Sequence, residues 1–141
     1  MQFVTHSEDE TIAVGRELAA LLPERAIVSL AGDLGAGKTT LVKGIAAARA
    51  GVDPDDVSSP TFTLVHEYGA SPRLVYHIDL YRLETARELA TLGLEELDEK
   101  PALILIEWAN RFNRLPLDLT HHIEIHHAAG GQRTITLSPC A

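Results

Sequence analysis

The sequence predicts an α/β fold with a mixed sheet, which has parallel strands at its centre, antiparallel hairpins at its edges and helices on its flanks. Two apolar runs, at residues 26–31 and 102–108, have the composition of strands buried on both faces of a parallel sheet. Two pairs of alternating segments, within residues 60–82 and 121–137, predict the hairpins. The 141 residues suffice for one hydrophobic core, so we expect a single domain over residues 1–141.

The first part of the chain predicts a helix, a strand and a second helix. The first helix begins with a capping-box spacing at Ser7, shows an apolar face and ends near Pro23. The buried strand at residues 26–31 leads directly into a glycine-rich loop, G-D-L-G-A-G-K-T. Residues 39–50 then predict a helix that Gly51 terminates.

The second part of the chain predicts two hairpins, separated by a short helix and a buried strand that ends on an acid. These elements are expected at residues 60–68 and 74–82 for the first hairpin, 84–92 for the helix, 102–108 for the buried strand, and 121–127 and 132–137 for the last hairpin.

Composition limits the classes of partner. The net charge of −8, from 20 acidic and 12 basic residues, argues against direct binding of DNA or of an anionic membrane. The single cysteine, Cys140, forms no disulfide framework, and no apolar run reaches the ~20 residues of a membrane span. The sequence begins with neither a basic nor an apolar leader region, so we expect a cytoplasmic protein.

The glycine-rich loop matches G-x-x-x-x-G-K-[ST], a motif whose backbone N–H groups surround the phosphates of a nucleoside triphosphate. In this motif Lys38 would reach the β- and γ-phosphates, Thr39 would ligate Mg²⁺ and Thr40 would meet the α-phosphate side. A chance glycine-rich turn is the alternative, which the strand before and the helix after disfavour. A P-loop NTPase-like sheet is therefore expected. The predicted nucleotide-binding residues are Gly32, Leu34, Gly35, Ala36, Gly37, Lys38, Thr39 and Thr40.

Two acids end predicted strands. A P-loop requires a carboxylate at the end of a neighbouring strand to hold Mg²⁺ or its waters and to orient the attacking water. Glu107 ends an apolar run, and Asp79 ends a strand in which His77 shares its face. We predict Lys38, Asp79 and Glu107 as catalytic residues, and Thr39 with the two acids as the metal site.

Structural roles remain open for these side chains. Asp79 could pair with Arg82, or cap the helix that starts near Glu84. Glu107 could be a solvated strand end. His77 could be an ordinary hydrogen-bonded residue rather than a base.

Hydroxyl groups cluster in S-S-P-T-F-T, residues 58–63, which we call the switch segment. It lies between the P-loop helix and the first hairpin, where P-loop proteins carry segments that sense the γ-phosphate. We therefore predict that Ser59, Thr61 and Thr63 act as a switch. A turn followed by an edge strand is the alternative.

Five stretches together resemble the TsaE family of small bacterial ATPases. They are G-D-L-G-A-G-K-T-T, S-P-T-F-T-L-V, Y-H-I-D-L-Y-R-L, E-L-A-T-L-G-L-E-E and I-E-W, in this order within residues 32–108. The resemblance implies a weak Mg²⁺-dependent ATPase that works with TsaD and TsaB in making threonylcarbamoyladenosine beside the tRNA anticodon. It implies that the ATPase cycles the TsaD–TsaB pair and that the transfer itself occurs on TsaD. The acidic charge agrees with contact to tRNA only through the complex.

The resemblance also implies residue roles by position. Lys38, Thr39 and Thr40 correspond to the family's nucleotide and Mg²⁺ contacts. Asp79 and Glu107 correspond to its functional acids, and Trp108 corresponds to its functional tryptophan. From the residues alone Trp108 would be a core side chain. We place His77 and Trp108 with the predicted switch and partner contacts. The family often continues E-W with Pro and an acid, whereas this chain has Ala109 and Asn110.

A small-molecule P-loop kinase is the alternative function. Arg111 and Arg114 could serve as lid arginines, but the chain has no substrate-binding insertion, and the absence of N-K-x-D disfavours a GTP switch. Arg133 could reach a nucleotide edge, although a surface charge is the simpler interpretation. No arginine finger is evident, although Arg82 could act in cis. We expect slow hydrolysis that partners stimulate, because the missing charge is worth about 10³ or more in rate.

Overall fold

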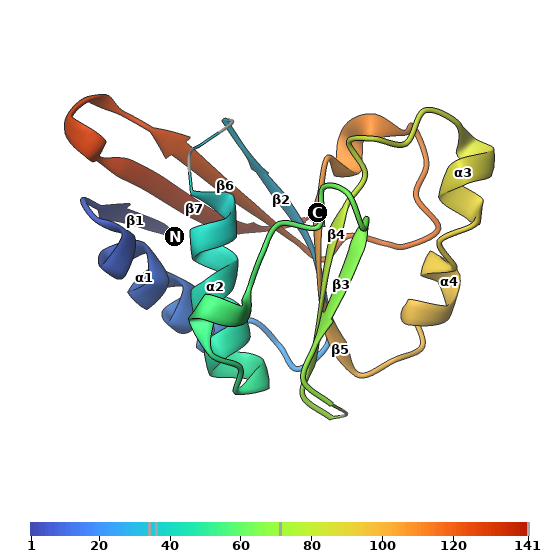
Figure 1. Ribbon diagram of the computed structural model, residues 1–141, viewed down its shortest axis with the longest axis horizontal. Coiled ribbons are helices and arrows are strands. Elements are labelled where there is room, and N and C mark those ends of the chain that lie inside the picture. The colour runs from blue at the N-terminus through green and yellow to red at the C-terminus, as the bar shows by residue number, and fades with distance from the viewer. Residues whose placement is uncertain (34, 36, 71, 141) are drawn as a thin grey trace.

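The computed structural model describes residues 1–33, 35, 37–70 and 72–140. Its strands and α-helices are β1 Gln2–Thr5, α1 Glu8–Leu21, β2 Ala26–Gly32, α2 Lys38–Ala50, β3 Val65–Tyr68, β4 Leu74–Asp79, α3 Ala86–Ala90, α4 Leu94–Leu97, β5 Ala102–Glu107, β6 His121–His127 and β7 Arg133–Pro139. The described strands form one sheet in the order β1-β7-β6-β2-β5-β4-β3 (Figure 1).

The sheet has the predicted parallel centre and antiparallel edges. β2 pairs in parallel with β5 and with β6, and β4 pairs in parallel with β5. The β3–β4, β6–β7 and β1–β7 pairs are antiparallel. The carboxyl ends of β2, β4 and β5 consequently meet at one edge of the sheet, which confirms the predicted fold class.

Helices cover both faces of the central strands. In β5, Leu103 and Leu105 pack with α1 and α2, whereas Ile104 and Ile106 pack with α3 and α4 on the opposite face. All these side chains are buried because successive residues of a strand point to opposite faces, and each face meets a helical layer. This double burial explains why the sequence of β5 is apolar until its last residue.

Arginines fasten the C-terminal ends of α1 and α2. Arg49 Nη2 donates to the carbonyl oxygens of Ala19 at 2.9 Å and Leu22 at 3.1 Å. Arg73, after the β3–β4 turn, donates to the carbonyl oxygens of Arg49 at 2.9 Å and Ala48 at 3.1 Å. Burial, and the nearby charge of Arg73, lower the pKa of Arg49 from its ordinary value. The two guanidinium groups thus occupy carbonyls that the helices leave unpaired.

The N-terminus of α1 has the predicted Ser7 cap, although Glu10 bonds the N–H of His6 and not that of Ser7 as in a capping box. The Ser7 side chain accepts a hydrogen bond from the Glu10 backbone N–H at 3.1 Å. Glu10 Oε1 in turn accepts from the His6 N–H at 3.2 Å. The side chains therefore satisfy backbone donors that have no partner inside the helix.

Replacing Ser7 with alanine should lower the free energy of unfolding by about 1 kcal/mol, because the Glu10 N–H loses its acceptor. Urea unfolding followed by circular dichroism measures the change. The Ser7→Asp variant is the matched control, since its carboxylate can replace the cap. Equal stability of Ser7→Ala and the wild type would show that water satisfies the donor at no cost.

The structure differs from the predicted elements in two segments, one near the start of the chain and one before β3. β1 was not predicted, although its four residues pair with β7. Residues 61–64, predicted as strand, form a turn that ends with Leu64 in a left-handed conformation, φ 72°. Its N–H donates to the Pro60 carbonyl at 2.6 Å. The strand β3 therefore begins only at Val65.

Three predicted elements are longer than the observed ones. β4 ends at Asp79, whose Oδ1 accepts from the Tyr81 N–H at 2.9 Å and so turns the chain. β5 ends one residue early because Trp108 has a left-handed φ of 60°. The helix predicted at 84–92 spans only Ala86–Ala90. The two strand ends are thus set by turns, and the start of α3 is set by the capping box at Thr85, not by the apolar pattern.

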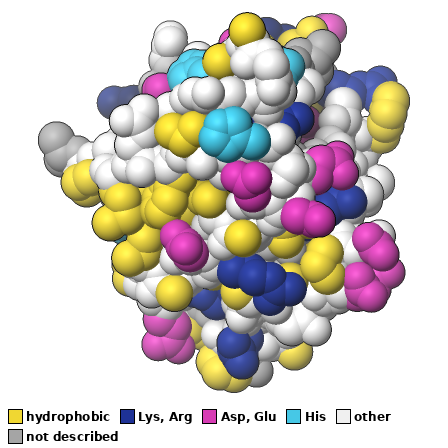
Figure 2. Space-filling model, turned by 90° about the vertical axis from the view of Figure 1, so that its left-hand side faces the viewer, with side chains coloured by type: hydrophobic (Ala, Val, Ile, Leu, Met, Phe, Trp, Pro, Cys, Tyr) yellow, Lys and Arg dark blue, Asp and Glu magenta, His cyan; other side chains and the backbone are white. Residues whose placement is uncertain are grey.

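The surface mixes charges of both signs. On the face drawn in Figure 2, acidic and basic side chains are interspersed and hydrophobic side chains gather on the left, unlike the basic stripe typical of a nucleic-acid-binding face. In the part of the chain that the structure describes, every helix is too short or too polar to cross a bilayer.

Candidate functional site

A cavity of about 510 Å³ opens where the carboxyl ends of the parallel strands meet the N-terminus of α2. In α/β sheets this edge is the usual place for ligands, and a helix N-terminus attracts phosphate. The residues that line the cavity are Glu8, Gly35, Gly37, Lys38, Thr39, Thr40, Ser59, Thr61, Asp79, Tyr81, Glu107, Trp108 and Arg133.

The glycines of the loop are required by their surroundings. Gly37 has φ 107°, and a Cβ there would lie 3.1 Å from Arg133 Nε. A Cβ on Gly32 would overlap the carbonyl oxygen of Ile125. Gly37 is the N-cap residue of α2 and has no side chain to occupy the first N–H groups, which can then meet an anion. Gly32 itself does not line the cavity, and Leu34 and Ala36 lie outside the described residues.

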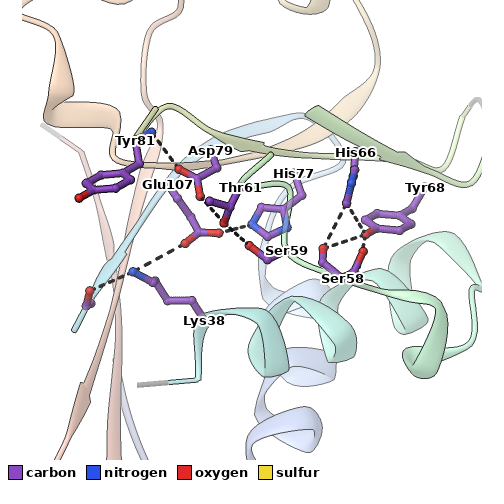
Figure 3. A network of polar contacts seen from close by, with 11 residues as sticks. Lys38, Ser58, Ser59, Thr61, His66, Tyr68, His77, Asp79, Tyr81 and Glu107 are labelled. Atoms are coloured by element: carbon purple, nitrogen blue, oxygen red, sulfur yellow. Dashed lines mark hydrogen bonds and ion pairs between the residues drawn. The ribbon is translucent and has the colours of Figure 1, made fainter. Parts of the chain in front are cut away.

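Lys38 brings a positive charge into the cavity. Its Nζ donates to the Gly32 carbonyl at 3.0 Å and lies 3.6 Å from Glu107 Oε1 (Figure 3). The same atom lies 5.9 Å from the centre of the Trp108 ring. The first residue of α2 is thereby linked to the last residue of β5.

Glu107 is held between two partners at the end of β5. Its Oε2 lies 2.6 Å from His77 Nε2, and Oε1 faces Lys38. Glu107 is 5% exposed and His77 is fully buried, so a solvated strand end is excluded. Nδ1 of His77 has no hydrogen-bond partner among the described residues. The structure therefore favours the interpretation of His77 as a hydrogen-bonded residue, with Glu107 as its partner.

Asp79 lies directly opposite Glu107 in the β4–β5 pair. It is 5% exposed, and its Oδ2 accepts from the Thr61 hydroxyl at 3.2 Å. Its Oδ1 accepts a hydrogen bond from the Tyr81 N–H, so both carboxylate oxygens have uncharged donors. The two acids predicted for the metal site therefore lie side by side at the carboxyl end of the sheet.

Neither structural alternative for Asp79 is observed. Arg82 places its guanidinium carbon 4.8 Å from the centre of the Phe62 ring. The helix α3 is capped instead by Thr85, which forms a capping box with Glu88. Asp79 does cap a turn, but through the N–H of Tyr81.

The switch segment contributes two of its three predicted residues to the cavity. Ser59 and Thr61 line it, and their hydroxyl oxygens lie 2.7 Å apart. Thr63 instead contacts His66 Nε2 on β3, at 2.7 Å. The edge strand that was the alternative interpretation begins after the segment, so the segment itself is a turn beside the cavity.

Trp108 lies at the cavity and not in the core. It is 43% exposed, and its ring centre lies 4.9 Å from that of Tyr81. The prediction from the residue pattern alone, that Trp108 is a core side chain, was wrong. The family resemblance had instead predicted a functional position. Sequence reasoning missed Tyr81 and Glu8, and treated Arg133 as a surface charge although it lines the cavity. The turn after Asp79, had it been recognised, would have indicated Tyr81.

The donor set fits a magnesium nucleotide. Thr39, Asp79 and Glu107 offer hydroxyl and carboxylate oxygens, the ligands that Mg²⁺ prefers, and Lys38 offers a cation for phosphate. Over the described residues no group of three or more His, Cys, Asp and Glu side chains is arranged to hold a metal alone. Mg²⁺ usually binds through one or two carboxylates with water and substrate phosphates, which agrees with this arrangement.

Comparison with known proteins gives one consistent family. The model of the family described as "Threonylcarbamoyl adenosine biosynthesis protein TsaE" matches residues 5–135. The tRNA threonylcarbamoyladenosine biosynthesis protein TsaE of Aquifex aeolicus is 37% identical over 124 residues, which are 88% of this chain and 86% of the relative. The protein of the same name from Bacillus subtilis is 37% identical over 139 residues, 98% of this chain and 85% of the relative.

A solved structure agrees with the fold. The crystal structure of Bacillus subtilis YdiB superposes with a TM-score of 0.78 at 30% identity, covering 100% of this chain and 86% of that chain. The superposition therefore spans the length of this chain. On this match in sequence and in fold, the chain belongs to the TsaE family of threonylcarbamoyl adenosine biosynthesis proteins.

Proposed function

We propose that this protein is a Mg²⁺-dependent ATPase that acts in the cytoplasm as an accessory subunit of the tRNA threonylcarbamoyladenosine machinery and cycles a TsaD–TsaB complex. The observation that carries the proposal is the meeting of Lys38 with two buried carboxylates, Asp79 and Glu107, at the N-terminus of α2. Phosphate binding needs the cation and the helix, and hydrolysis needs an acid beside them. Both requirements are met in one cavity.

The residues of α2 would bind the phosphates. Its first N–H groups face the anion, Lys38 pairs with the terminal phosphates, and Thr40 lines the side of the α-phosphate. When bound with Thr39 and the acids, Mg²⁺ would neutralise charge on the transferring phosphoryl group. Lys38 would then exchange part of its contact with Glu107 for a contact with phosphate.

The two acids are expected to have different roles. Glu107 already faces a cation and a histidine, so it suits the task of holding Lys38 and the metal. Among the described residues Asp79 accepts from the Thr61 hydroxyl and the Tyr81 N–H, which leaves lone pairs for a water molecule. Asp79 is therefore the better candidate to orient the attacking water.

We expect slow hydrolysis by the isolated protein, because two described arginines considered above for a cis charge or a lid, Arg82 and Arg111, have other contacts. Arg133, the arginine of the cavity lining, lies beside Gly37, while Arg82 lies against Phe62. Arg111, considered above as a kinase lid residue, donates from Nε to the Leu83 carbonyl at 2.9 Å. A partner that supplies a cation at the transferring phosphoryl group would raise the rate by about 10³.

Phosphate release from ATP should therefore be slow for the pure protein and should rise on addition of a TsaD–TsaB pair. A coupled phosphate assay measures it, and the Lys38→Ala variant controls for contaminating ATPases. Equal turnover with and without the pair would contradict the partner assignment. Transfer of phosphate to an added metabolite, instead of release, would support the kinase alternative.

A further inference from the structure

One histidine on β3 ties both ends of the switch segment. His66 Nε2 lies 2.7 Å from the Thr63 hydroxyl, and Nδ1 lies 3.2 Å from the Ser58 carbonyl oxygen. A single neutral tautomer satisfies both contacts: Nδ1–H donates to the carbonyl, and Nε2 accepts from the hydroxyl. The first and last residues of the segment are thus joined through one ring; Figure 3 shows its contact with Ser58.

A tyrosine on the same strand supports the same end. The Tyr68 hydroxyl donates to the Ser58 carbonyl at 3.3 Å and accepts from the Ser58 N–H at 3.3 Å. It also lies 3.3 Å from His66 Nδ1, and the two rings meet edge to face with centres 6.1 Å apart. The Tyr68 ring is partly buried and packs against the core under α2, which restricts its position.

The segment does not hold its conformation by itself. Leu64, which follows it, has a left-handed φ of 72°, a conformation that disfavours a residue with a Cβ. Such a residue persists only where its neighbours hold it. Here the Leu64 carbonyl accepts from the Asp79 N–H at 2.9 Å, so the segment is also fastened to the end of β4.

The held segment reaches the candidate catalytic acid. The Ser59 hydroxyl contacts that of Thr61, and the Thr61 hydroxyl donates to Asp79 Oδ2. A continuous path of hydrogen bonds and backbone therefore leads from His66 and Tyr68 to Asp79, although neither ring lines the cavity.

We propose that His66 and Tyr68 are positioning residues, which hold the switch segment so that Thr61 fixes the carboxylate of Asp79. They set the rate of phosphate release and not the affinity for nucleotide. The kinetic part of this inference rests on the proposed function. The structural part does not, because the order of the segment can be measured without nucleotide.

The test compares Tyr68→Phe and His66→Leu with the wild type and with Glu67→Gln. Tyr68→Phe keeps the ring and removes only the hydroxyl. Glu67 is an exposed residue between the two on β3, outside the hydrogen-bond path and the cavity lining, and serves as the matched control. His66→Gln is a conservative variant, because its amide can both donate and accept.

Tyr68→Phe and His66→Leu should each lower kcat about 3- to 10-fold, which is the effect of losing one hydrogen bond. KM should change less than about twofold. The affinity for ATP, followed by the fluorescence of Trp108, should stay within about twofold of the wild type. Amide hydrogen exchange at residues 58–64 should quicken in the nucleotide-free variants, while Glu67→Gln behaves as the wild type. His66→Gln should recover part of kcat.

Unchanged exchange at residues 58–64 together with unchanged kcat would overturn the proposal. A loss of ATP affinity as large as the loss of kcat would also overturn it, since it would mean that the whole cavity has been disturbed. If the wild type with TsaD–TsaB releases no phosphate, the proposed function fails. Exchange in the nucleotide-free proteins then decides on the positioning role: faster exchange supports it and unchanged exchange overturns it.

Discussion

Replacing Asp79 with asparagine should lower phosphate release by about 10²-fold or more, the usual contribution of a positioned acid or base. The asparagine oxygen can still accept from the Tyr81 N–H, and the Thr61 hydroxyl can reverse and accept from the amide. The change therefore keeps the shape of the turn and removes the negative charge. Nucleotide binding through Lys38 and α2 should remain within a few-fold of the wild type.

Phosphate release in the presence of TsaD–TsaB measures the first effect, and titration of Trp108 fluorescence with ATP measures the second. Asp56→Asn is the control, because it removes the same charge from an exposed position in the turn Pro54–Asp56. Full activity of the Asp79 variant would show that this carboxylate serves only the turn and the switch segment. The task of orienting water would then pass to Glu107.

Replacing Gly44 with alanine should lower the free energy of unfolding by about 2–3 kcal/mol, the upper part of the range for overpacked cores. A Cβ on Gly44 would overlap the carbonyl oxygen of Ile12 and lie 3.0 Å from the Cα of Gly15. A Cβ on Gly15 would overlap the Leu41 carbonyl oxygen in the same way. These neighbours are backbone atoms that no rotamer change can move, so α1 and α2 must separate.

The sign of this effect is informative because alanine in a helix otherwise stabilises by about 1 kcal/mol relative to glycine. Urea unfolding measures the change. The Ala13→Gly variant, on the exposed side of α1, is the control and should cost only the difference in helix propensity. A more stable Gly44→Ala protein would show that the helices can cross without this close approach.

The phosphate loop and the buried strands could be predicted because their signals are local. The order of a strand, the glycine-rich loop at residues 32–37 and a helix specifies the position of Lys38 without reference to the rest of the chain. A continuous apolar run likewise indicates a strand covered on both faces, as β5 proved to be. From parallel strands alone, Asp79 and Glu107 could be placed at one edge.

Two features that were missed, β1 and the turn before β3, depend on a distant partner and on a single backbone angle. β1 has only four residues, and its partner β7 begins at Arg133. The residues before β3 alternate as a strand does, yet the left-handed angle of Leu64 turns them. No periodicity in the sequence encodes either feature.

Within the site, the chemistry of the side chains was predictable and their pairing was not. The residue types do not reveal that Glu107 lies between Lys38 and His77, because this depends on the angle between α2 and the sheet. Only the family resemblance predicted Trp108 outside the core, since a tryptophan after an apolar run has the pattern of a core residue. Tyr81 was missed because its position follows from the turn at Asp79.

The pairing of β1 with β7 has a consequence for synthesis. The backbone of Met1 exchanges hydrogen bonds with Leu137, its N-terminal amine donating at 3.0 Å and its carbonyl accepting at 2.9 Å. A ribosome makes the chain from the N-terminus, so β1 must wait for β7 to emerge from the exit tunnel. We therefore expect the nascent protein to complete its sheet only after translation has passed residue 139, although the glycine-rich loop is translated early.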